Sequence, residues 1–505
     1  MKRTAIIVFL TLATALQAFL GATRPSAAQE SAAVEPQSLR FRMLLEEAGV
    51  AGEQFAPFAA WNGVIDASEA LTISQILFRL AQFDRKAAAD ATVGVGDLMI
   101  AEGTVRNVRQ LELPASAPAE VRESGLYKCE LKQPNGKLVA VLSTQVPAAW
   151  LRQEGGSTLD ESASLRGVRL GSVELDGVAV PLLLTNHIAW RPVAGVAAGT
   201  AWLAAQGFDA ALLDDVRQNR AFAKPNESSE AQAFYTALAT LAAGDAAELR
   251  TLARKAVASE ATRREAIAVS AAERQRELNR ELETVLPERR AVIEKELAAL
   301  RSSQTMAAYI QKRAALGLSS VGPMFNEPVE SVGQFFVIEG IARRAVRIVV
   351  GDGGSSSRTT AEGPSPLTHY YELDVFPTDA QNNPVICCVA RLPEGFPTGD
   401  LIREPVRVSG IFFKKWAYAR RPNHGVADAT VSTRVAPPLM LAAEPEWLPA
   451  TMPVRSDRGL WAGIGILAAS VTVALLLFRT ARRDRLARRQ LARYDGPLDD
   501  LLEPK

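Results

Sequence analysis

The chain has 505 residues, with 57 basic and 56 acidic side chains, and its formal net charge is +1. A nearly neutral chain lacks the broad positive field that binds nucleic acid nonspecifically, so we expect no nucleic-acid partner. The hydrophobic fraction of 48% fits globular domains with sizeable cores. Cysteine is too scarce for a disulfide framework, and we expect Cys129, Cys387 and Cys388 to be buried.

The N-terminus has the pattern of a secretory signal. Lys2 and Arg3 precede an apolar run from Ala5 to Leu20, and Ser26-Ala27-Ala28 offers small residues for cleavage. We therefore expect a signal peptide over residues 1–28. An uncleaved N-terminal anchor is the alternative.

Residues 29–92 are expected to form a helical lead-in. Apolar residues recur there with a period close to 3.6, at Leu71, Ile73, Ile76, Leu77 and Leu80. Ser68-Glu69-Ala70 precedes this run as an N-terminal cap, and the same triplet occurs again at Ser229-Glu230-Ala231.

Two β-rich stretches are diverged copies of one module, over residues 93–200 and 331–450. Six features recur in the same order: Val95-Gly96 and Val332-Gly333, Glu102-Gly103 and Glu339-Gly340, Tyr127 and Tyr371, Val146-Pro147 with Trp150 and Leu392-Pro393 with Phe396, Gly167–Leu170 and Pro405–Val408, Pro181 with Trp190 and Pro438 with Trp447. Such self-similarity indicates a repeated fold unit. We expect the two tryptophans to be buried at equivalent edges.

The second copy predicts the strand order of the module. A long apolar strand, a half-buried alternating strand and a returning strand are followed by a break and two further strands, between Phe335 and Leu441. Five strands in this arrangement are typical of a small Greek-key barrel of the OB type. An SH3-like barrel or a short sandwich would produce similar sequence patterns.

Residues 201–330 are predicted to be helical. Between Asp245 and Arg313, apolar residues are spaced four and three apart, which is typical of an amphipathic or coiled-coil helix. Pro287 should kink this helix or begin a new one. The resulting arm could pack on its own barrel or mediate self-association, and the sequence leaves both open.

The C-terminal region predicts a single membrane span. Residues 459–478 carry no charge, about the length that crosses roughly 30 Å of hydrocarbon. The tail at 479–505 follows with seven arginines, at 479, 482, 483, 485, 488, 489 and 493. Positive charge marks the cytoplasmic side, so we expect the body outside the cytoplasmic membrane and the tail inside.

The segment from Phe412 to Arg421 combines aromatic and basic residues. OB-type faces bind extended anionic or sugar polymers with stacked rings and cations. We therefore predict a ligand- or partner-binding surface on the second barrel, made of Lys414, Lys415, Trp416, Tyr418, Arg420, Arg343 and Arg344. The competing interpretation is a strand whose rings enter the core while its lysines reach solvent.

Catalytic motifs are absent from the sequence. The three histidines, His187, His369 and His424, are far apart, and no metal-binding, nucleophile-elbow or phosphate-loop pattern occurs. We expect a protein that is not an enzyme and that has no cofactor and no metal. The alternative is an envelope hydrolase or transferase whose site lies between the two barrels.

The second copy resembles a group of uncharacterised, membrane-anchored proteins of planctomycete-type bacteria. The resemblance covers about a quarter of the chain and is carried by Ala342–Ile348, Tyr370–Phe376, Gln381–Pro384, Leu392–Gly395, Val406–Val408 and Phe412–Tyr418. It implies a bacterial envelope protein, and it implies no activity, ligand or catalytic residue.

Together these patterns predict an α+β protein with two tandem OB-like barrels, helical lead-ins, an inserted coiled-coil-like arm and one C-terminal transmembrane helix. We expect a noncatalytic envelope protein that binds or scaffolds at the outer face of the cytoplasmic membrane. Its partners would be the membrane itself and an envelope polymer, a lipid headgroup or another protein.

Overall fold

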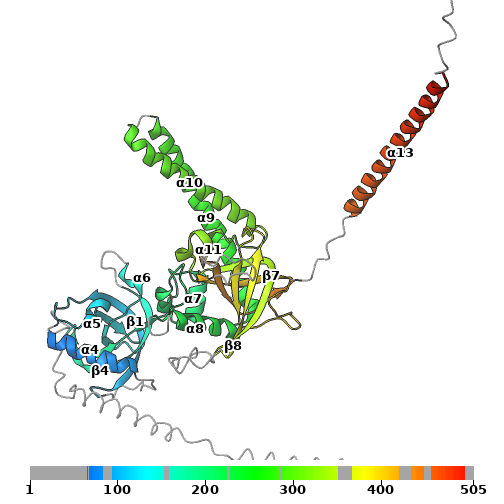
Figure 1. The fold of residues 1–505 in the computed structure, drawn as a ribbon. Helices are drawn as coiled ribbons and strands as arrows, with labels where there is room; N and C mark the ends of the chain where they lie inside the picture. The colour runs from blue at the N-terminus through cyan, green and yellow to red at the C-terminus, as the bar shows by residue number, and fades with distance from the viewer. Residues whose placement is uncertain are drawn as a thin grey trace, which may run out of the picture. The chain divides into compact units, whose positions relative to one another are not determined.

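The computed structural model describes residues 65, 67–82, 94–152, 159–223, 228–283, 286–350, 367–419, 434–448 and 457–494. The predicted signal peptide lies outside these residues, as do most of the lead-in and His424. The chain divides into two compact units, Met1–Leu448 and Pro449–Lys505. The first unit is a mixed α+β structure that contains two six-stranded sheets (Figure 1).

The first sheet closes into a barrel. Its strands are β1 (Leu98–Gln110), β2 (Tyr127–Lys132), β3 (Leu138–Ser143), β4 (Glu161–Leu175), β5 (Val178–Thr185) and β6 (Ile188–Trp190). They lie in the order β1-β2-β3-β5-β4-β6, and β1 also pairs with β4, so five strands form a ring. The β3–β5 pair is parallel, and the other pairs are antiparallel.

The second sheet repeats this order. Its strands are β7 (Phe335–Val349), β8 (His369–Pro377), β9 (Val385–Val389), β10 (Glu404–Lys415), β13 (Pro438–Ala442) and β14 (Glu446–Trp447). The places of β1 to β5 are taken, in order, by β7, β8, β9, β10 and β13. As in the first sheet, one pair is parallel, here β13 with β9. Pairing of β13 with β10 closes these five strands into a ring. Two short strands, β11 (Tyr418–Ala419) and β12 (Arg434–Val435), pair separately. The shared order is compatible with the OB type.

Side chains at equivalent positions make the same contacts in both sheets. The Trp190 indole donates to Glu161 Oε2 over 2.9 Å, and the Trp447 indole donates to Glu404 Oε2 over 2.8 Å. Each indole also meets an aromatic ring edge-on: Trp190 meets Trp150 and Trp447 meets Phe396. The duplication therefore extends from strand order to individual hydrogen bonds. The burial differs, however, because Trp190 is 6% exposed and Trp447 is 39% exposed.

One of the six correspondences predicted between the two copies is wrong. Ala163 lies opposite Trp190 and Val406 lies opposite Trp447, so Pro405–Val408 corresponds to Ser162–Leu165. The sequence comparison had matched it to Gly167–Leu170, which lies five residues further along. By the corrected register, Lys414 and Lys415 stand where the first copy has Gly171 and Ser172.

Gly103 of β1 and Gly340 of β7 occupy equivalent positions where the neighbouring strand leaves no room for a side chain. A Cβ at Gly103 would lie 2.2 Å from the carbonyl oxygen of Lys132, and one at Gly340 would lie 2.4 Å from that of Phe376. Neither carbonyl can yield easily, because each belongs to the neighbouring strand.

Alanine at either glycine should therefore destabilise the chain by about 2–3 kcal/mol, the cost of overpacking against backbone. Denaturant unfolding of Gly103→Ala and Gly340→Ala would measure it. Glu102→Ala is the matched control, since Glu102 is exposed and lies 3.9 Å from Arg191 in a weak ion pair. A Gly103→Ala chain as stable as that control would contradict the overlap.

A lead-in helix covers the same outer face of each barrel. Helix α4 (Ala67–Gln82) packs on β5, and α8 (Glu230–Ala243) packs on β13, the equivalent strand. Ile73 and Ile76 of α4 join Leu142 and Leu184 in one apolar cluster. Phe234 and Leu238 of α8 join Cys388 and Leu441 in another. Residues from all five strands fill each barrel interior. The repeated unit is thus a helix with a barrel.

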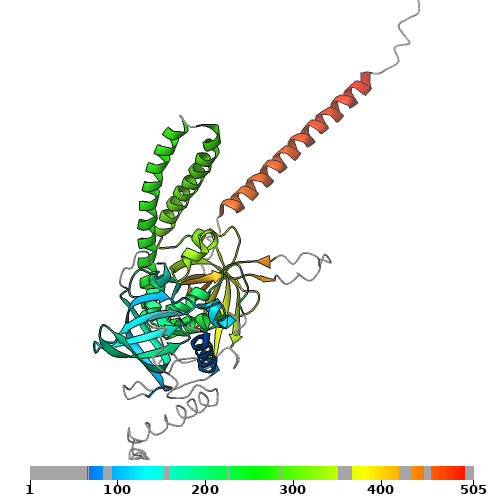
Figure 2. The same ribbon diagram turned by 90° about the vertical axis from the view of Figure 1, so that its left-hand side faces the viewer.

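The predicted helical arm consists of two long helices, α9 (Ala246–Leu282) and α10 (Pro287–Ala314), which pack side by side (Figure 2). Pro287 begins the second helix at its first turn, as expected from its missing N–H. Leu278, Ile293 and Leu297 form the small core between them. The coiled-coil-like character of the arm is not confirmed. The shorter helices are α5 (Ala119–Ser124), α6 (Ala148–Leu151), α7 (Ala198–Ala205), α11 (Gly322–Asn326) and α12 (Pro328–Ser331).

The described part of the second unit is the helix α13 (Asp457–Tyr494). It includes residues 459–478, the predicted membrane span, although the side chains of 459–466 lie outside those described. Within the part of the chain that the structure describes, no helix combines the length and the apolar character needed to span a membrane.

Candidate functional site at the connector

The segment between the two barrels touches both of them. We call residues 198–230 the connector; it comprises α7, the 3-10 helix η3 (Ala210–Asp215) and the start of α8. η3 packs on β6 of the first barrel, and α8 packs on β13 of the second. A site between the barrels would therefore include polar groups of this segment.

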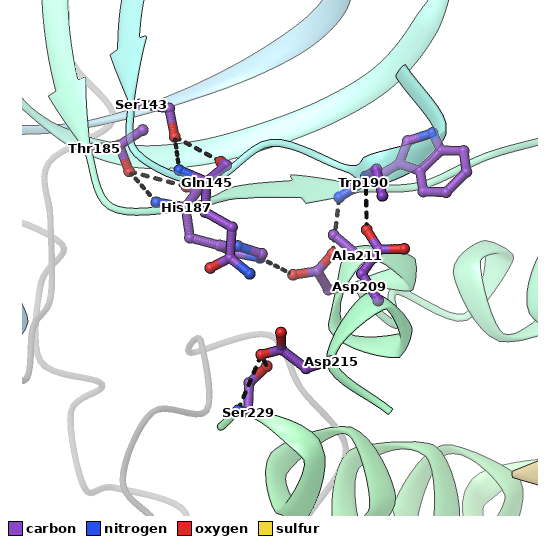
Figure 3. Close-up of polar contacts among 11 residues, drawn as sticks. Ser143, Gln145, Thr185, His187, Trp190, Asp209, Ala211, Asp215 and Ser229 are labelled. Carbon is purple, nitrogen blue, oxygen red and sulfur yellow. Dashed lines mark hydrogen bonds and ion pairs between the residues drawn. The ribbon is translucent and has the colours of Figure 1, made fainter. Parts of the chain in front are cut away.

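Asp209 fixes the connector to the first barrel (Figure 3). Its Oδ1 accepts the backbone N–H of Trp190 over 2.9 Å and that of Ala211 over 3.0 Å, capping η3. Its Oδ2 contacts His187 Nε2 as a hydrogen bond and ion pair. A single carboxylate thus joins the turn, the strand β6 and an imidazole. Ala210 and Ala211 complete the joint by packing into the barrel core.

One carboxylate contacts His187, and two others contribute negative charge to its surroundings. Burial of the ring opposes its charged form, but the hydrogen bond that its Nε2–H donates to Asp209 and the charges of Asp209, Asp215 and Asp214 together raise the pKa of His187 above 6.5. Burial also raises the pKa of Asp214, which accepts the Ala148 N–H over 2.8 Å. Asp215 accepts both the N–H and the hydroxyl of Ser229 at the start of α8.

Lys414 and Glu230 fix the connector to the second barrel. Their side chains are 0% and 1% exposed, and Lys414 Nζ donates to Glu230 Oε1 over 2.5 Å. Glu230 also accepts the backbone N–H groups of Arg217 and Ala223. Burial lowers the pKa of Lys414, while its bond to Glu230 opposes that shift.

The hydroxyls nearest His187 are engaged elsewhere. Ser143 donates to the Gln145 carbonyl over 2.7 Å, and Thr185 donates to the carbonyls of Arg166 and His187 (Figure 3). A nucleophile would need its proton within reach of the imidazole. Among the described residues, neither of these two hydroxyls donates to the His187 ring.

The thiols are poorly suited to chemistry. Cys129, Cys387 and Cys388 are all free and buried. Burial raises the pKa of Cys129 to about 12 and those of Cys387 and Cys388 well above the usual value. A thiol that stays protonated is a weak nucleophile and a weak ligand. Within the part of the chain that the structure describes, no cluster of three or more His, Cys, Asp or Glu residues could hold a metal ion.

The predicted surface on β10 is largely enclosed. Lys414 cannot meet a ligand, because it is buried against Glu230 and its Nζ lies 4.9 Å from the Phe222 ring centre. Lys415 is half-buried and donates to the Phe325 carbonyl over 3.2 Å. Trp416 packs on Phe222 within the apolar cluster under α8. The alternating exposed face that we expected is absent from this part of β10, since a bulge between Phe412 and Lys414 interrupts the alternation.

The two arginines of β7 lie apart from this segment. Arg344 forms ion pairs with Glu372, Asp374 and Asp400, which neutralise it. Arg343 is exposed, and its guanidinium stacks 4.0 Å from the ring centre of Phe376. Tyr418 lies in β11, but its side chain and the whole of Arg420 fall outside the described residues.

Sequence analysis missed Asp209 and Glu230 as the residues that organise the connector. A local signal existed for Asp209, which precedes Ala210-Ala211-Leu212 as an N-cap does. Comparison with known proteins adds no further guide: no family model, curated protein or solved structure matches the chain.

Proposed function

We propose that the chain is a noncatalytic envelope protein that binds or scaffolds partners at the outer face of the cytoplasmic membrane. In this proposal residues 459–478 are the anchor and the arginine-rich tail lies in the cytoplasm. The observation that carries it is the surface of α13. Its described apolar side chains are more than half exposed at Leu467, Val471, Val473, Leu475, Leu476, Leu477 and Phe478.

Four consecutive apolar residues, 475–478, point to all sides of a helix, since each residue turns by about 100°. This turn of the helix has no polar side, and a surrounding apolar medium would favour it. Exposed arginines begin at the next position, Arg479, and continue through Arg482, Arg483 and Arg485. This boundary supports an anchor with its charged end retained in the cytoplasm.

The buried pairs of the first unit support the noncatalytic part of the proposal. Lys414 and Glu230 satisfy each other, and Asp209 serves His187 and the backbone of Trp190. Leu249, Ala253 and Val257 at the start of α9 join the apolar cluster of the second barrel, so the base of the arm packs on that barrel. The far part of the arm has its own small core at Leu278, Ile293 and Leu297. We place partner binding or self-association on this arm.

Protease protection tests the topology. One epitope would be inserted at the exposed Asn135-Gly136 turn and another placed after Lys505. Protease added to spheroplasts should remove the first epitope and spare the second. A lost C-terminal epitope with an intact body would contradict the proposed orientation.

A matched pair of variants tests the anchor itself. Leu467→Arg with Val471→Arg should move the chain out of the alkali-resistant membrane pellet, since each charge costs about 2.5–3.5 kcal/mol near the centre of a span. Leu486→Arg lies beyond the span and should leave the pellet unchanged.

A further inference from the structure

We propose that the joint between the connector and the first barrel is a pH-sensitive latch, closed while His187 carries a proton and open once the ring is neutral. This inference concerns the two barrels alone and does not depend on the membrane anchor.

The two joints of the connector are built differently. On the second barrel, Thr200 N–H donates to the Gly333 carbonyl over 3.0 Å, and Asn219 N–H donates to the Lys415 carbonyl over 2.9 Å. The buried Lys414–Glu230 pair lies beside them. These backbone bonds and the enclosed pair give the second joint little sensitivity to pH near neutrality.

The joint with the first barrel depends on ionised carboxylates. The hydrogen bonds described between the connector and that barrel all end on Asp209 or Asp214. Beyond them, the contact consists mainly of Ala210 and Ala211, whose small side chains bury little apolar surface. A change in the charge of His187, the partner of Asp209, should therefore weaken the contact between the connector and the first barrel. The contact between the connector and the second barrel should change less.

The charges that face His187 are predominantly negative. Asp209, the N-cap of η3, contacts the ring, and Asp214 and Asp215 at the end of η3 add negative charge; Arg152, which follows α6, acts as a positive counter-charge to Asp214. Its neighbours on the barrel side, Thr185 and Gln145, are neutral (Figure 3). The protonated imidazole is thus the cation that balances three carboxylates. When the ring becomes neutral, its charge attraction to Asp209 across the joint is lost, and the hydrogen bonds of Asp209 and Asp214 remain without that attraction.

The direction of the pH effect follows from the raised pKa of His187. A group whose pKa is higher in the closed state binds its proton more tightly there. Its stabilising contribution is complete below about pH 6.5, the ordinary value for histidine, and is lost as pH rises through the raised pKa. The latch should accordingly open on the alkaline side of neutrality.

Distance measurements between spin labels test the latch in the full chain. Lys137→Cys places a label on an exposed turn of the first barrel, and Leu401→Cys, at a side chain 95% exposed, places one on the second. The three native thiols are buried and should not be labelled. The distance distribution should be narrow at pH 6 and at least twofold broader at pH 9.

His187→Gln should give the broad distribution at both pH values, whereas His369→Gln should retain the transition. A second label pair, Ala205→Cys with Leu401→Cys, spans only the joint with the second barrel and should stay narrow throughout. A narrow distribution at pH 9 in the unsubstituted chain would overturn the proposal. So would a pH-dependent broadening that persists in His187→Gln.

Discussion

Replacing Lys414 with alanine should lower the free energy of unfolding by about 3–5 kcal/mol, because it leaves the Glu230 carboxylate buried without its counter-charge. Both side chains are essentially inaccessible to solvent, and no exposed arrangement can rescue the remaining charge. Glu230 also holds the backbone of Arg217 and Ala223, so its displacement would loosen the connector as well.

The double variant Lys414→Met with Glu230→Gln should recover most of this loss. Methionine fills the volume of the lysine stem, and the glutamine carbonyl can still accept backbone N–H groups. Lys415→Ala is the matched control: its ammonium makes one bond to a carbonyl, so about 1 kcal/mol is expected. Chemical denaturation would measure all three. A Lys414→Ala chain as stable as Lys415→Ala would show that the pair contributes little.

The strand order of the barrels could be predicted from the sequence because a half-buried strand alternates its side chains. Duplication strengthened the prediction, since Trp190 and Trp447 mark the same place in each copy. The register of the fourth strand was not predicted correctly. The short pattern at Gly167–Leu170 resembles Pro405–Val408, and only cross-strand pairing reveals that Ser162–Leu165 is the true counterpart.

The candidate site was much less accessible to sequence reasoning. Lys414 and Glu230 are separated by 184 positions, and nothing in the local sequence of either residue indicates the other. An ideal strand would place Phe412 and Lys414 on one face, but the bulge between them breaks the two-residue period. Lys414 and Lys415, two members of the predicted surface, thus lie at a joint between the second barrel and its connector.

His187 illustrates the same limit. A lone histidine in a strand-rich segment carries no local signal of its partners, and Asp209 lies 22 residues away beyond an intervening helix. The N-cap pattern before Ala210 predicts a helical turn, yet it does not predict where that turn packs. The local turn could therefore be predicted from the sequence, whereas the tertiary contact between Asp209 and His187 could not.

The two equivalent tryptophans should differ sharply in their contribution to stability. Trp190→Ala should cost about 3–5 kcal/mol, the loss expected for a large buried ring. Trp190 is covered on one side by Trp150 and approached on the other by the Asp209 turn. Trp447 keeps the same indole bond and the same aromatic neighbour but leaves 39% of its surface exposed, so Trp447→Ala should cost only about 1–2 kcal/mol.

Each variant should be followed by circular dichroism in denaturant, because two barrels in one chain can unfold in separate steps. The expected pattern is a large shift of one transition for Trp190→Ala and a small shift for Trp447→Ala. Trp190→Phe and Trp447→Phe serve as controls that keep most of the ring and remove the indole donor. Equal losses in the two alanine variants would mean that Trp447 is covered in solution by a segment or partner outside the described residues.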